Sequence, residues 1–344
     1  MPLQSWVVLP HTMAIGIGLL GLGKHGIRYA RHLAQGEIPG ARLAAVWRRD
    51  RAQGEAVAAE LGTRYHASPE ALLSDPEVAA VIMAVPAGLH GAMALQVAAA
   101  QKPLLLEKPL ATELEAGRTI VQAFEEAGVP LCVAQTLRFD PLLAAMAEAL
   151  ATFGPLRGFG FEQRLEPRGL PWEDDPRLAG GGVLFQTAIH TVDALRVVTA
   201  AAEVEVLAAT TRSVLYQNLE DHALLHLELR GGPHLRAGPA LGDVRVSKIG
   251  GSRHHHFALY AEGGGIEADF IDRRLTITLG RQRSSRSVPE QATVVSTTRA
   301  FVEALQAGLP MPITGADALE NVRILSEARQ RSGGKREIAP ASSA

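Results

Sequence analysis

The sequence predicts an α/β protein with two domains: a doubly wound parallel sheet, followed by an α+β domain with a large, mostly antiparallel open sheet. A chain of 344 residues is long enough for two hydrophobic cores. Between residues 13 and 136, short apolar runs alternate with segments of helical period, which is typical of a parallel sheet covered by helices. Between residues 137 and 335, strand-like runs follow one another with few helices between them, as in an antiparallel sheet.

The elements of the first domain follow from the period of their apolar residues. Residues 14–20 form an apolar run that leads into glycines and then into a segment of helical spacing. Thr112 and Glu115 have the spacing of a capping box at the start of a helix that Gly128 ends. The other expected elements are strands at 43–47, 78–85, 104–106 and 129–134 and a helix at 52–61.

The second domain is expected to begin with a helix capped by Asp140, because Pro141 suits the first helical position. Residues 1–12 and 336–344 are expected to be flexible ends, and Met13 offers an alternative start just before the first strand. Expected strands lie at 156–165, 203–213, 221–230, 243–249, 255–262, 265–270 and 274–279, and expected helices near 182–198, 296–307 and 316–331.

Composition excludes several classes of protein. The formal net charge is −2, so no basic footprint points to nucleic acid. No apolar run approaches the roughly 18 residues of a membrane span, and the first twelve residues lack the basic start of a signal peptide. The single cysteine, Cys132, lies in an apolar run and excludes an internal disulfide. We therefore expect a cytoplasmic protein.

Residues 21–26 read G-L-G-K-H-G, a G-x-G-x-x-G motif between an expected strand and an expected helix. This context makes it the dinucleotide-binding fingerprint of a Rossmann fold. The first glycine allows the turn, the second lets the backbone approach the pyrophosphate, and the third lets the helix pack closely on the strand. Cofactor contacts are expected from Gly21, Gly23, Lys24, His25 and Gly26.

The end of the second strand indicates which dinucleotide is bound. NAD-binding proteins place an acidic residue there for the ribose 2′-hydroxyl, about 20 residues after the loop. This chain has Arg48 and Arg49, and arginine binds phosphate through charge-assisted hydrogen bonds. The sequence therefore favours NADP(H) over NAD(H). Asp50 is the alternative ribose ligand, and in that case the two arginines are a solvated pair.

Two further segments are expected at the carboxyl edge of the parallel sheet, where open α/β sheets bind ligands. Pro86 and His90 follow the strand that ends near residue 85. Glu107, Lys108 and Pro109 follow the next strand. We expect Pro86, His90, Glu107 and Lys108 to contribute to the cofactor site.

A glycine-rich segment at residues 180–182 precedes a helix that carries several polar residues. Gln186, His190 and Asp193 have i, i+4, i+7 spacing and therefore share one face of that helix. The imidazole of histidine titrates near neutral pH and suits proton transfer. The alternatives without a role in the reaction are a helix-flanking surface lysine at 108, an interior histidine at 190 with its hydrogen bonds satisfied, and an Asp193 that pairs with Arg196.

The glycine loop, the E-K-P triplet and the G-G-G…H-x-x-D helix, in this order, resemble the glucose–fructose oxidoreductase / inositol dehydrogenase / MocA family over residues 13–330. The resemblance implies a Rossmann domain and a second domain with a large open sheet. It implies NAD(P)-dependent oxidation or reduction at a carbon that bears a hydroxyl or carbonyl group, often in sugars, inositols or their derivatives.

The resemblance also implies roles for individual residues. Lys108 would contact the substrate hydroxyl and the nicotinamide ribose, and His190 would take the hydroxyl proton. Many members carry Asp where this chain has Gln186, which hydrogen-bonds but exchanges no proton. A non-catalytic, dinucleotide-sensing regulator is therefore the alternative function. A cis peptide bond is expected between Lys108 and Pro109.

Other polar residues are candidates for substrate binding or assembly. The expected substrate ligands are Gln186 and Asp193 on the helix of His190, together with Arg138, Arg164 and Trp172. The last three flank the expected cleft, although no spacing compels a role for them, and the substrate itself is not readable from the sequence. His222 and His226 share one face of a strand whose other face carries leucines, and the open face is the expected interface of a homodimer or homotetramer. Residues 254–256 are consecutive histidines, which alternate in a strand and cannot converge on one metal ion, so no metal is expected.

Overall fold

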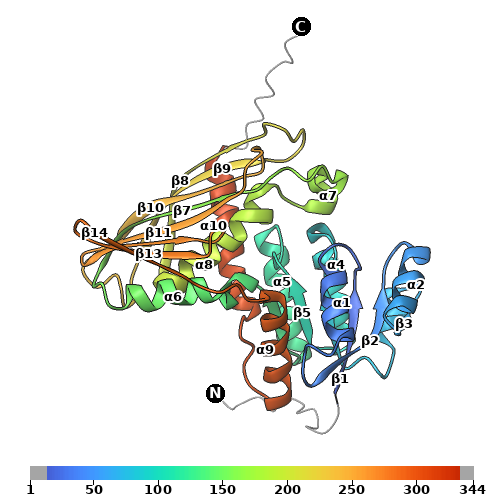
Figure 1. Cartoon of the computed structure of the whole chain (residues 1–344). Helices are drawn as coiled ribbons and strands as arrows, with labels where there is room; N and C mark the ends of the chain where they lie inside the picture. The colour runs from blue at the N-terminus through green and yellow to red at the C-terminus, as the bar shows by residue number, and fades with distance from the viewer. Residues whose placement is uncertain (1–13, 334–344) are drawn as a thin grey trace. The chain divides into compact units, whose positions relative to one another are not determined.

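The computed structural model describes residues 14–333, so the expected flexible ends at 1–12 and 336–344 lie outside the described residues (Figure 1). The chain divides into two compact units between Thr136 and Leu137. Residues 292–320 belong to the first unit, although the sequence assigned them to the second domain. Among the described residues, no helix is long and apolar enough to cross a membrane.

The first unit contains a six-stranded parallel sheet in the order β3-β2-β1-β4-β5-β6. This is the doubly wound order, and its switch point lies between β1 and β4. Strands β1, β4, β5 and β6 are buried along their whole length, because helices cover a parallel sheet on both faces. The strands are β1 (Ile15–Leu20), β2 (Ala41–Trp47), β3 (Arg64–Tyr65), β4 (Ala80–Met83), β5 (Leu104–Glu107) and β6 (Leu131–Ala134).

Short polar side chains and glycine determine where the helices of this unit begin and end. Asp50 and Ser68 accept a backbone N–H at the starts of α2 and α3. Gly128 ends α5 in the left-handed conformation with φ 63°, as predicted. The predicted capping box is wrong, because Glu113 is the N-cap residue and makes no side-chain cap. The helices are α1 (Gly26–Ala34), α2 (Arg51–Glu60), α3 (Pro69–Leu73), α4 (His90–Ala99), α5 (Leu114–Ala127) and α9 (Thr293–Ala307).

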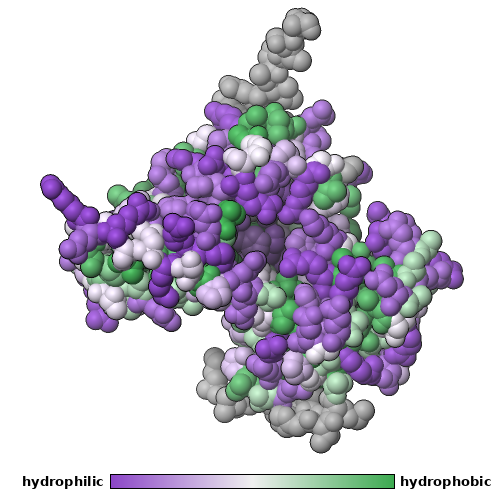
Figure 2. All heavy atoms as spheres, in the orientation of Figure 1, coloured by the Kyte–Doolittle hydropathy of each residue, from purple (hydrophilic) through white to green (hydrophobic). Residues whose placement is uncertain are grey.

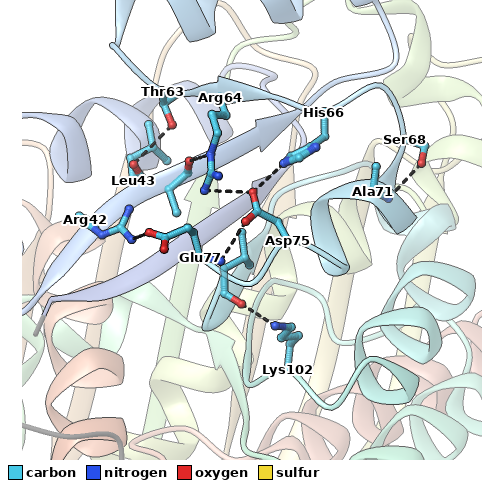
Figure 3. Close-up of polar contacts among 12 residues, drawn as sticks. Arg42, Leu43, Thr63, Arg64, His66, Ser68, Ala71, Asp75, Glu77 and Lys102 are labelled. Atoms are coloured by element: carbon cyan, nitrogen blue, oxygen red, sulfur yellow. Dashed lines mark hydrogen bonds and ion pairs between the residues drawn. The ribbon is translucent and has the colours of Figure 1, made fainter.

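A polar cluster around Asp75 ties β3 and α3 to the start of β4 (Figure 3). The carboxylate accepts from His66 over 2.8 Å, from Arg64 over 3.0 Å and from the backbone N–H of Glu77 over 2.9 Å. Burial opposes ionisation of Asp75, but the hydrogen bonds and the arginine outweigh it and hold the pKa of this carboxyl below its usual value. Nearby, Lys102 donates to the carbonyl of Val78 over 2.6 Å.

The second unit contains an eight-stranded sheet in the order β14-β13-β12-β11-β7-β10-β9-β8. All pairs are antiparallel except β7 with β10, which confirms the expectation of a mostly antiparallel sheet. Its strands are β7 (Leu156–Arg164), β8 (Glu203–Arg212), β9 (His222–Arg230), β10 (Ala240–Ser247), β11 (His254–Ala261), β12 (Gly264–Asp269), β13 (Arg274–Leu279) and β14 (Gln282–Ser287).

One face of this sheet packs on helices and forms the core of the unit. Leu225 and Phe257 are fully buried there, and the ring of Phe161 stacks on that of Phe257 at 4.1 Å. Asp140 caps the helix that follows it, as predicted, by accepting from the N–H of Leu142 over 2.8 Å. The helices of the unit are α6 (Pro141–Leu150), α7 (Pro176–Ala179), α8 (Ile189–Thr199) and the part of α10 (Gly315–Arg331) beyond Glu320.

The histidines at 254–256 alternate between the two faces, as strand geometry requires. The rings of His254 and His256 stack on one face at 5.8 Å. His255 points to the core, where its ring stacks on Phe270 at 4.4 Å and burial lowers its pKa to about 4. Within residues 14–333, no three His, Cys, Asp or Glu side chains form a group that would hold a metal ion.

The edge strand β14 is fully exposed, and the sequence did not predict it. Its residues, QRSSRS, are all polar, so no apolar alternation marks them as a strand. Figure 2 shows strongly hydrophilic atoms over the tip of the β13–β14 hairpin. Charged and polar side chains protect such an edge from pairing with other chains.

Candidate active site

The glycine loop lies between β1 and α1, and the surroundings of each of its three glycines differ. Gly21 has φ 97°, and a Cβ there would lie 2.7 Å from the carbonyl oxygen of Ala84. A Cβ at Gly26 would lie 1.9 Å from the carbonyl oxygen of Gly21, so the helix can start this close only without a side chain. Gly23 is exposed, and a Cβ there would meet no atom within 4 Å. Gly21 and Gly26 are therefore packed against the backbone, whereas Gly23 leaves free space where a phosphate would bind.

Arg48 stands directly after β2 and reaches back to this loop. Its Nη1 donates to the carbonyl of Leu22 over 2.9 Å. Asp50, the alternative ribose ligand, has both carboxylate oxygens bound to Gln53, at 3.0 Å from its backbone N–H and 2.7 Å from its side-chain amide. Asp50 is therefore the N-cap of α2, whereas the guanidinium of Arg48 lies at the loop.

The other predicted cofactor residues lie around the same edge of the sheet. Lys24 and His25 are exposed within the glycine loop, and Arg49 is exposed beside Arg48. Pro86 lies between β4 and α4 and is half-buried.

Lys108 follows β5 and is half-buried, and its backbone is fixed by Glu107 and Pro109 on either side. The peptide bond between Lys108 and Pro109 is cis, as predicted. Glu107 accepts from the backbone N–H of Lys108 over 3.2 Å and from the hydroxyl of Tyr29 over 2.8 Å. Burial, and then Glu107, raise the pKa of the Tyr29 hydroxyl well above its usual value, so Tyr29 remains a donor. The sequence did not single out Tyr29, because it resembles any other core residue of α1.

His90 has a supporting position between two backbone segments, and the cofactor contact expected from the sequence stays a prediction. The residue is 1% exposed. Its Nδ1 lies 2.8 Å from the carbonyl oxygen of Pro109, and its Nε2 lies 3.1 Å from that of Val85. Burial lowers its pKa. The ring therefore joins the end of β4 to the segment that carries Lys108.

Gln135 is a buried amide that the sequence analysis missed. It follows β6 at the carboxyl edge of the parallel sheet and is 1% exposed. Neither Nε2 nor Oε1 has a hydrogen-bond partner among the described residues. A buried amide without partners is costly and indicates an absent water or ligand. A polar residue directly after a buried parallel strand was the available sequence signal.

In the second unit, the helix that carries His190 begins at a tightly packed glycine. A Cβ at Gly182 would lie 2.0 Å from the carbonyl oxygen of Glu220. That oxygen accepts from the N–H of Val183 over 2.7 Å, and the Glu220 carboxylate accepts from the N–H of Leu184 over 3.3 Å. Burial raises the pKa of Glu220. The helix start is therefore capped by a residue from the β8–β9 connection.

The predicted helix near 182–198 consists of η4 (Leu184–Ala188), a turn of π-helix, and α8, which continues directly from it. His190 lies in the first turn of α8 and is half-buried. Gln186 lies inside the π-turn, and its amide donates to the carbonyls of Glu173 over 2.9 Å and Gly181 over 3.0 Å. Its Oε1 accepts from the ammonium of Lys248. The amide of Gln186 is therefore engaged by the protein's own groups.

Two of the expected substrate ligands bind each other. Asp193 is fully buried and accepts from Nε and Nη2 of Arg138 over 2.8 and 2.6 Å. Asn321 donates to the same carboxylate over 2.7 Å, and Arg196 donates to Asn321 over 2.7 Å. Asp193 therefore holds Arg138, and the expected contact of Asp193 with a substrate stays a prediction.

Arg164 also lies elsewhere than expected. It pairs with Glu162 over 3.1 Å on β7. Because successive residues of a strand point to opposite faces, Arg164 lies on the face opposite the buried Phe161 and Gln163. It therefore belongs to the open face of the sheet. Trp172, in the short helix η3 (Pro171–Asp174), is 37% exposed.

The first unit combines a doubly wound sheet with a glycine cradle at its carboxyl edge, which defines an α/β protein that binds a dinucleotide. A family model described as an oxidoreductase family with an NAD-binding Rossmann fold matches residues 15–135. A second model, the GFO/IDH/MocA C-terminal domain, matches residues 156–267. The chain belongs to the GFO/IDH/MocA family of oxidoreductases, as the resemblance in its motifs implied.

Similar proteins include dehydrogenases named for inositols. Inositol 2-dehydrogenase 2 from Saccharopolyspora erythraea is 34% identical over 225 residues, 64% of this chain and 65% of that protein. The scyllo-inositol 2-dehydrogenase (NAD(+)) from Bacillus subtilis is 26% identical over 319 residues, 89% of this chain and 90% of that protein. The first match thus spans just under two thirds of its relative's length.

Solved structures share the fold at lower identity. GenD2 from gentamicin A biosynthesis, in complex with NAD, has a TM-score of 0.82 and 24% identity, and the match covers 97% of this chain and 98% of that one. KijD10, a 3-ketoreductase from Actinomadura kijaniata in complex with NADP, has a TM-score of 0.83 and 18% identity over 92% of this chain and 98% of that one. These likenesses concern the fold.

Proposed function

We propose that the chain is an NADP(H)-dependent oxidoreductase. It would transfer a hydride between the nicotinamide and the hydroxyl or carbonyl carbon of a sugar, a polyol or a derivative of one. The observation that carries this proposal is the position of Lys108 and the glycine loop at the same edge of one parallel sheet. The relatives named for inositols support the substrate class.

In the proposed reaction, His190 and Lys108 have different roles. The bound nicotinamide supplies or accepts the hydride. His190 takes the proton from the substrate hydroxyl in the oxidative direction and returns it to the carbonyl oxygen in the reductive one. Lys108 orients that oxygen through its ammonium group, and Glu107, Tyr29 and His90 hold the segment that carries it.

Arg48 supports the preference for NADP(H). The 2′-phosphate distinguishes NADP from NAD, and a guanidinium at the end of β2 suits it. The carboxylate that would favour NAD, that of Asp50, caps α2 instead. Names of relatives include both cofactors, NAD(+) for the Bacillus enzyme and NADP(+) for a D-xylose 1-dehydrogenase of Haloferax volcanii. The choice of cofactor in this chain therefore depends on its own residues.

Two measurements test the function. Absorbance at 340 nm, followed across a panel of sugars, polyols and keto compounds with each cofactor, detects turnover. Calorimetric titration should show NADPH binding more tightly than NADH by on the order of 1–3 kcal/mol, the strength of a hydrogen bond to a charged group. Arg48→Ala should remove most of that difference, whereas Arg49→Ala should affect it less. Equal affinities for the two cofactors in the unchanged protein would contradict the preference.

One feature of the sequence, the glutamine at position 186, favours a regulator that only senses the dinucleotide. That amide has partners in Glu173, Gly181 and Lys248. Gln186 therefore has a structural use in the fold that an enzyme and a regulator would share, so its presence by itself does not favour a regulator.

We also propose that the protein is a cytoplasmic homo-oligomer that assembles through the open face of the eight-stranded sheet. Leu241 and Tyr260 lie on that face and are 54% and 52% exposed. A broad sheet face without covering helices suits a two-fold contact, because the same patch serves both copies. The chain has a single cysteine, Cys132, which is buried, and this sparing use of cysteine suits a reducing compartment.

A further inference from the structure

The second unit contains a buried lysine, Lys248, that is not among the residues to which the proposed reaction assigns a role. Lys248 follows β10 and is 3% exposed. Its ammonium donates to Oε1 of Glu173 over 3.2 Å and to Oε1 of Gln186. Glu173 is 2% exposed, and its Oε2 accepts from the hydroxyl of Tyr216 over 3.2 Å. A buried charge is tolerated only with a partner, so these residues form one balanced network.

This network joins three separate segments of the second unit. Glu173 belongs to η3, Gln186 to the π-turn η4, and Tyr216 to the β8–β9 connection. The neighbouring Asp174 accepts backbone N–H groups of residues 217–219 at 2.8–2.9 Å, which fixes the connection against η3. Lys248 is the cation at the centre of the network. Besides Glu173, the charged group that influences it electrostatically is Arg168.

The π-turn needs such support. π-helical turns are rare insertions of one residue into an α-helix and occur frequently at functional sites. Gln186 holds the turn by donating to the carbonyls of Glu173 and Gly181 while accepting from Lys248. If the turn relaxed to a regular α-helix, residues beyond it would shift by one position, which is a rotation of about 100°. His190 comes four residues after Gln186 and would turn with them.

We propose that Lys248 is a positioning residue for His190: with Glu173 it fixes the amide of Gln186, and that amide fixes the π-turn that sets the direction of His190. The inference rests on the proposed function only in giving His190 a catalytic role. It also accounts for the glutamine itself. An amide accepts from Lys248 and donates to two carbonyls, whereas an aspartate has no donor and would place a second negative charge beside Glu173.

The first test separates positioning from folding by steady-state kinetics. Lys248→Met keeps most of the side-chain volume but removes the charge, and should lower kcat by about 10- to 100-fold, the cost of misplacing a catalytic group. The KM of the substrate and the Kd of NADPH should change less than about threefold, because Lys248 is 3% exposed and its ammonium is bound to Glu173 and Gln186. Lys248→Arg should recover part of kcat. Lys102→Met is the matched control, since Lys102 also donates to a protein oxygen but lies in the first unit.

Changes at Gln186 should reproduce the loss. Gln186→Asp should lower kcat to a similar extent, and Gln186→Asp combined with Lys248→Met should be little worse than either alone, because both act through one contact. An unchanged or raised kcat in Gln186→Asp would overturn the inference, since a carboxylate would then serve at that position without the amide contacts.

The second test needs no turnover. In protein labelled with ¹³C-histidine, the ring signal of His190 is assigned with His190→Asn and compared between variants. Lys248→Met should move that signal and Lys102→Met should not. If the unchanged protein oxidises and reduces nothing in the panel but the signal moves, the proposed function fails and the positioning role stands. If the signal and kcat both stay unchanged, the positioning role is wrong. Gln186→Asn replaces Lys248→Met if that variant yields no folded protein.

Discussion

Buried charged side chains in each unit have partners within the same unit. In the second unit Arg138 pairs with Asp193 and Lys248 with Glu173, and in the first unit the Glu107 carboxylate accepts from the neutral hydroxyl of Tyr29. These contacts fix the segments to which the residues belong. The proton transfer in the proposed reaction then falls to His190, and the orientation of the substrate oxygen falls to Lys108.

Substitutions of the two catalytic residues should fail differently. His190→Ala removes a general base and should lower kcat by about 10²–10⁴. NADPH should still bind, because the glycine loop lies in the other unit. Lys108→Ala should lower kcat and raise the substrate KM as well, since its ammonium contact exists before and during the reaction. Steady-state kinetics with fluorescence titration of NADPH measures both, and normal activity in both variants would refute the assignment.

Gln135 offers a test in which stability and binding should move in opposite directions. Gln135→Leu replaces a buried amide without partners by an apolar group of similar size, so the free protein should be as stable or more stable. If the amide meets the dinucleotide, the Kd of NADPH should rise by roughly tenfold, the loss of one or two hydrogen bonds. Thermal denaturation without ligand and calorimetry with NADPH give the two values. An unchanged Kd would assign the amide to a buried water.

At the scale of secondary structure, local caps and long-range contacts together position the elements around the site. The segment of β3 and α3 illustrates this. β3 has only two residues and α3 only five, so neither is stable by itself. The carboxylate of Asp75 connects both to the start of β4 through His66, Arg64 and the N–H of Glu77 (Figure 3).

The Asp75 cluster should make the fold sensitive to acid. Because the folded pKa of Asp75 is lowered, its ionised form stabilises the fold above the unfolded pKa, and this contribution is lost as pH falls through the folded pKa. Asp75→Asn should lower the free energy of unfolding at neutral pH by about 1–3 kcal/mol. The difference in the free energy of unfolding between this variant and the unchanged protein should become smaller in acid. Urea denaturation followed by circular dichroism between pH 3 and 8 measures this.

The control for that experiment is Glu77→Gln, which removes an exposed partner of Arg42. Exposed ion pairs contribute about 0–1 kcal/mol, so this variant should stay close to the unchanged protein. A deficit in Asp75→Asn that is equally large at every pH would show that the ionised carboxylate is not the source of the stabilisation.

At the scale of the whole molecule, the second unit offers an open sheet face on which histidines meet carboxylates. His226 lies 2.5 Å from Asp243, and His256 lies 3.6 Å from Glu267. The opposite face is the core, with Leu225 and Leu227 fully buried. This division agrees with the predicted alternation of histidines and leucines along β9.

The open face should carry the contact between copies. Light scattering at micromolar concentration should give the mass of a dimer or tetramer. Leu241→Glu combined with Tyr260→Lys should shift it to the monomer, because charges would then replace exposed apolar groups on the contact. Leu309→Glu, at a residue 59% exposed in the first unit, should leave the assembly intact. A monomeric unchanged protein would contradict the predicted interface.

The sequence by itself determined the fold class, the glycine loop, and the helix that carries His190. These features depend on local signals: apolar period, glycines with a steric reason, and residues a few positions apart. It also gave the alternation of faces in β9 and β11, because strand geometry alone sets that pattern.

Only the tertiary structure decided which polar groups meet. Arg138 and Asp193 are 55 residues apart, and Lys248 and Gln186 are 62 apart. Nothing local marks such pairs, so helical spacing predicts Asp193 and Gln186 as substrate ligands but does not show that a distant residue binds each of them. The same reason explains β14, whose polar residues form a strand only because β13 lies beside them, and residues 292–320, whose place in the first unit depends on contacts far along the chain.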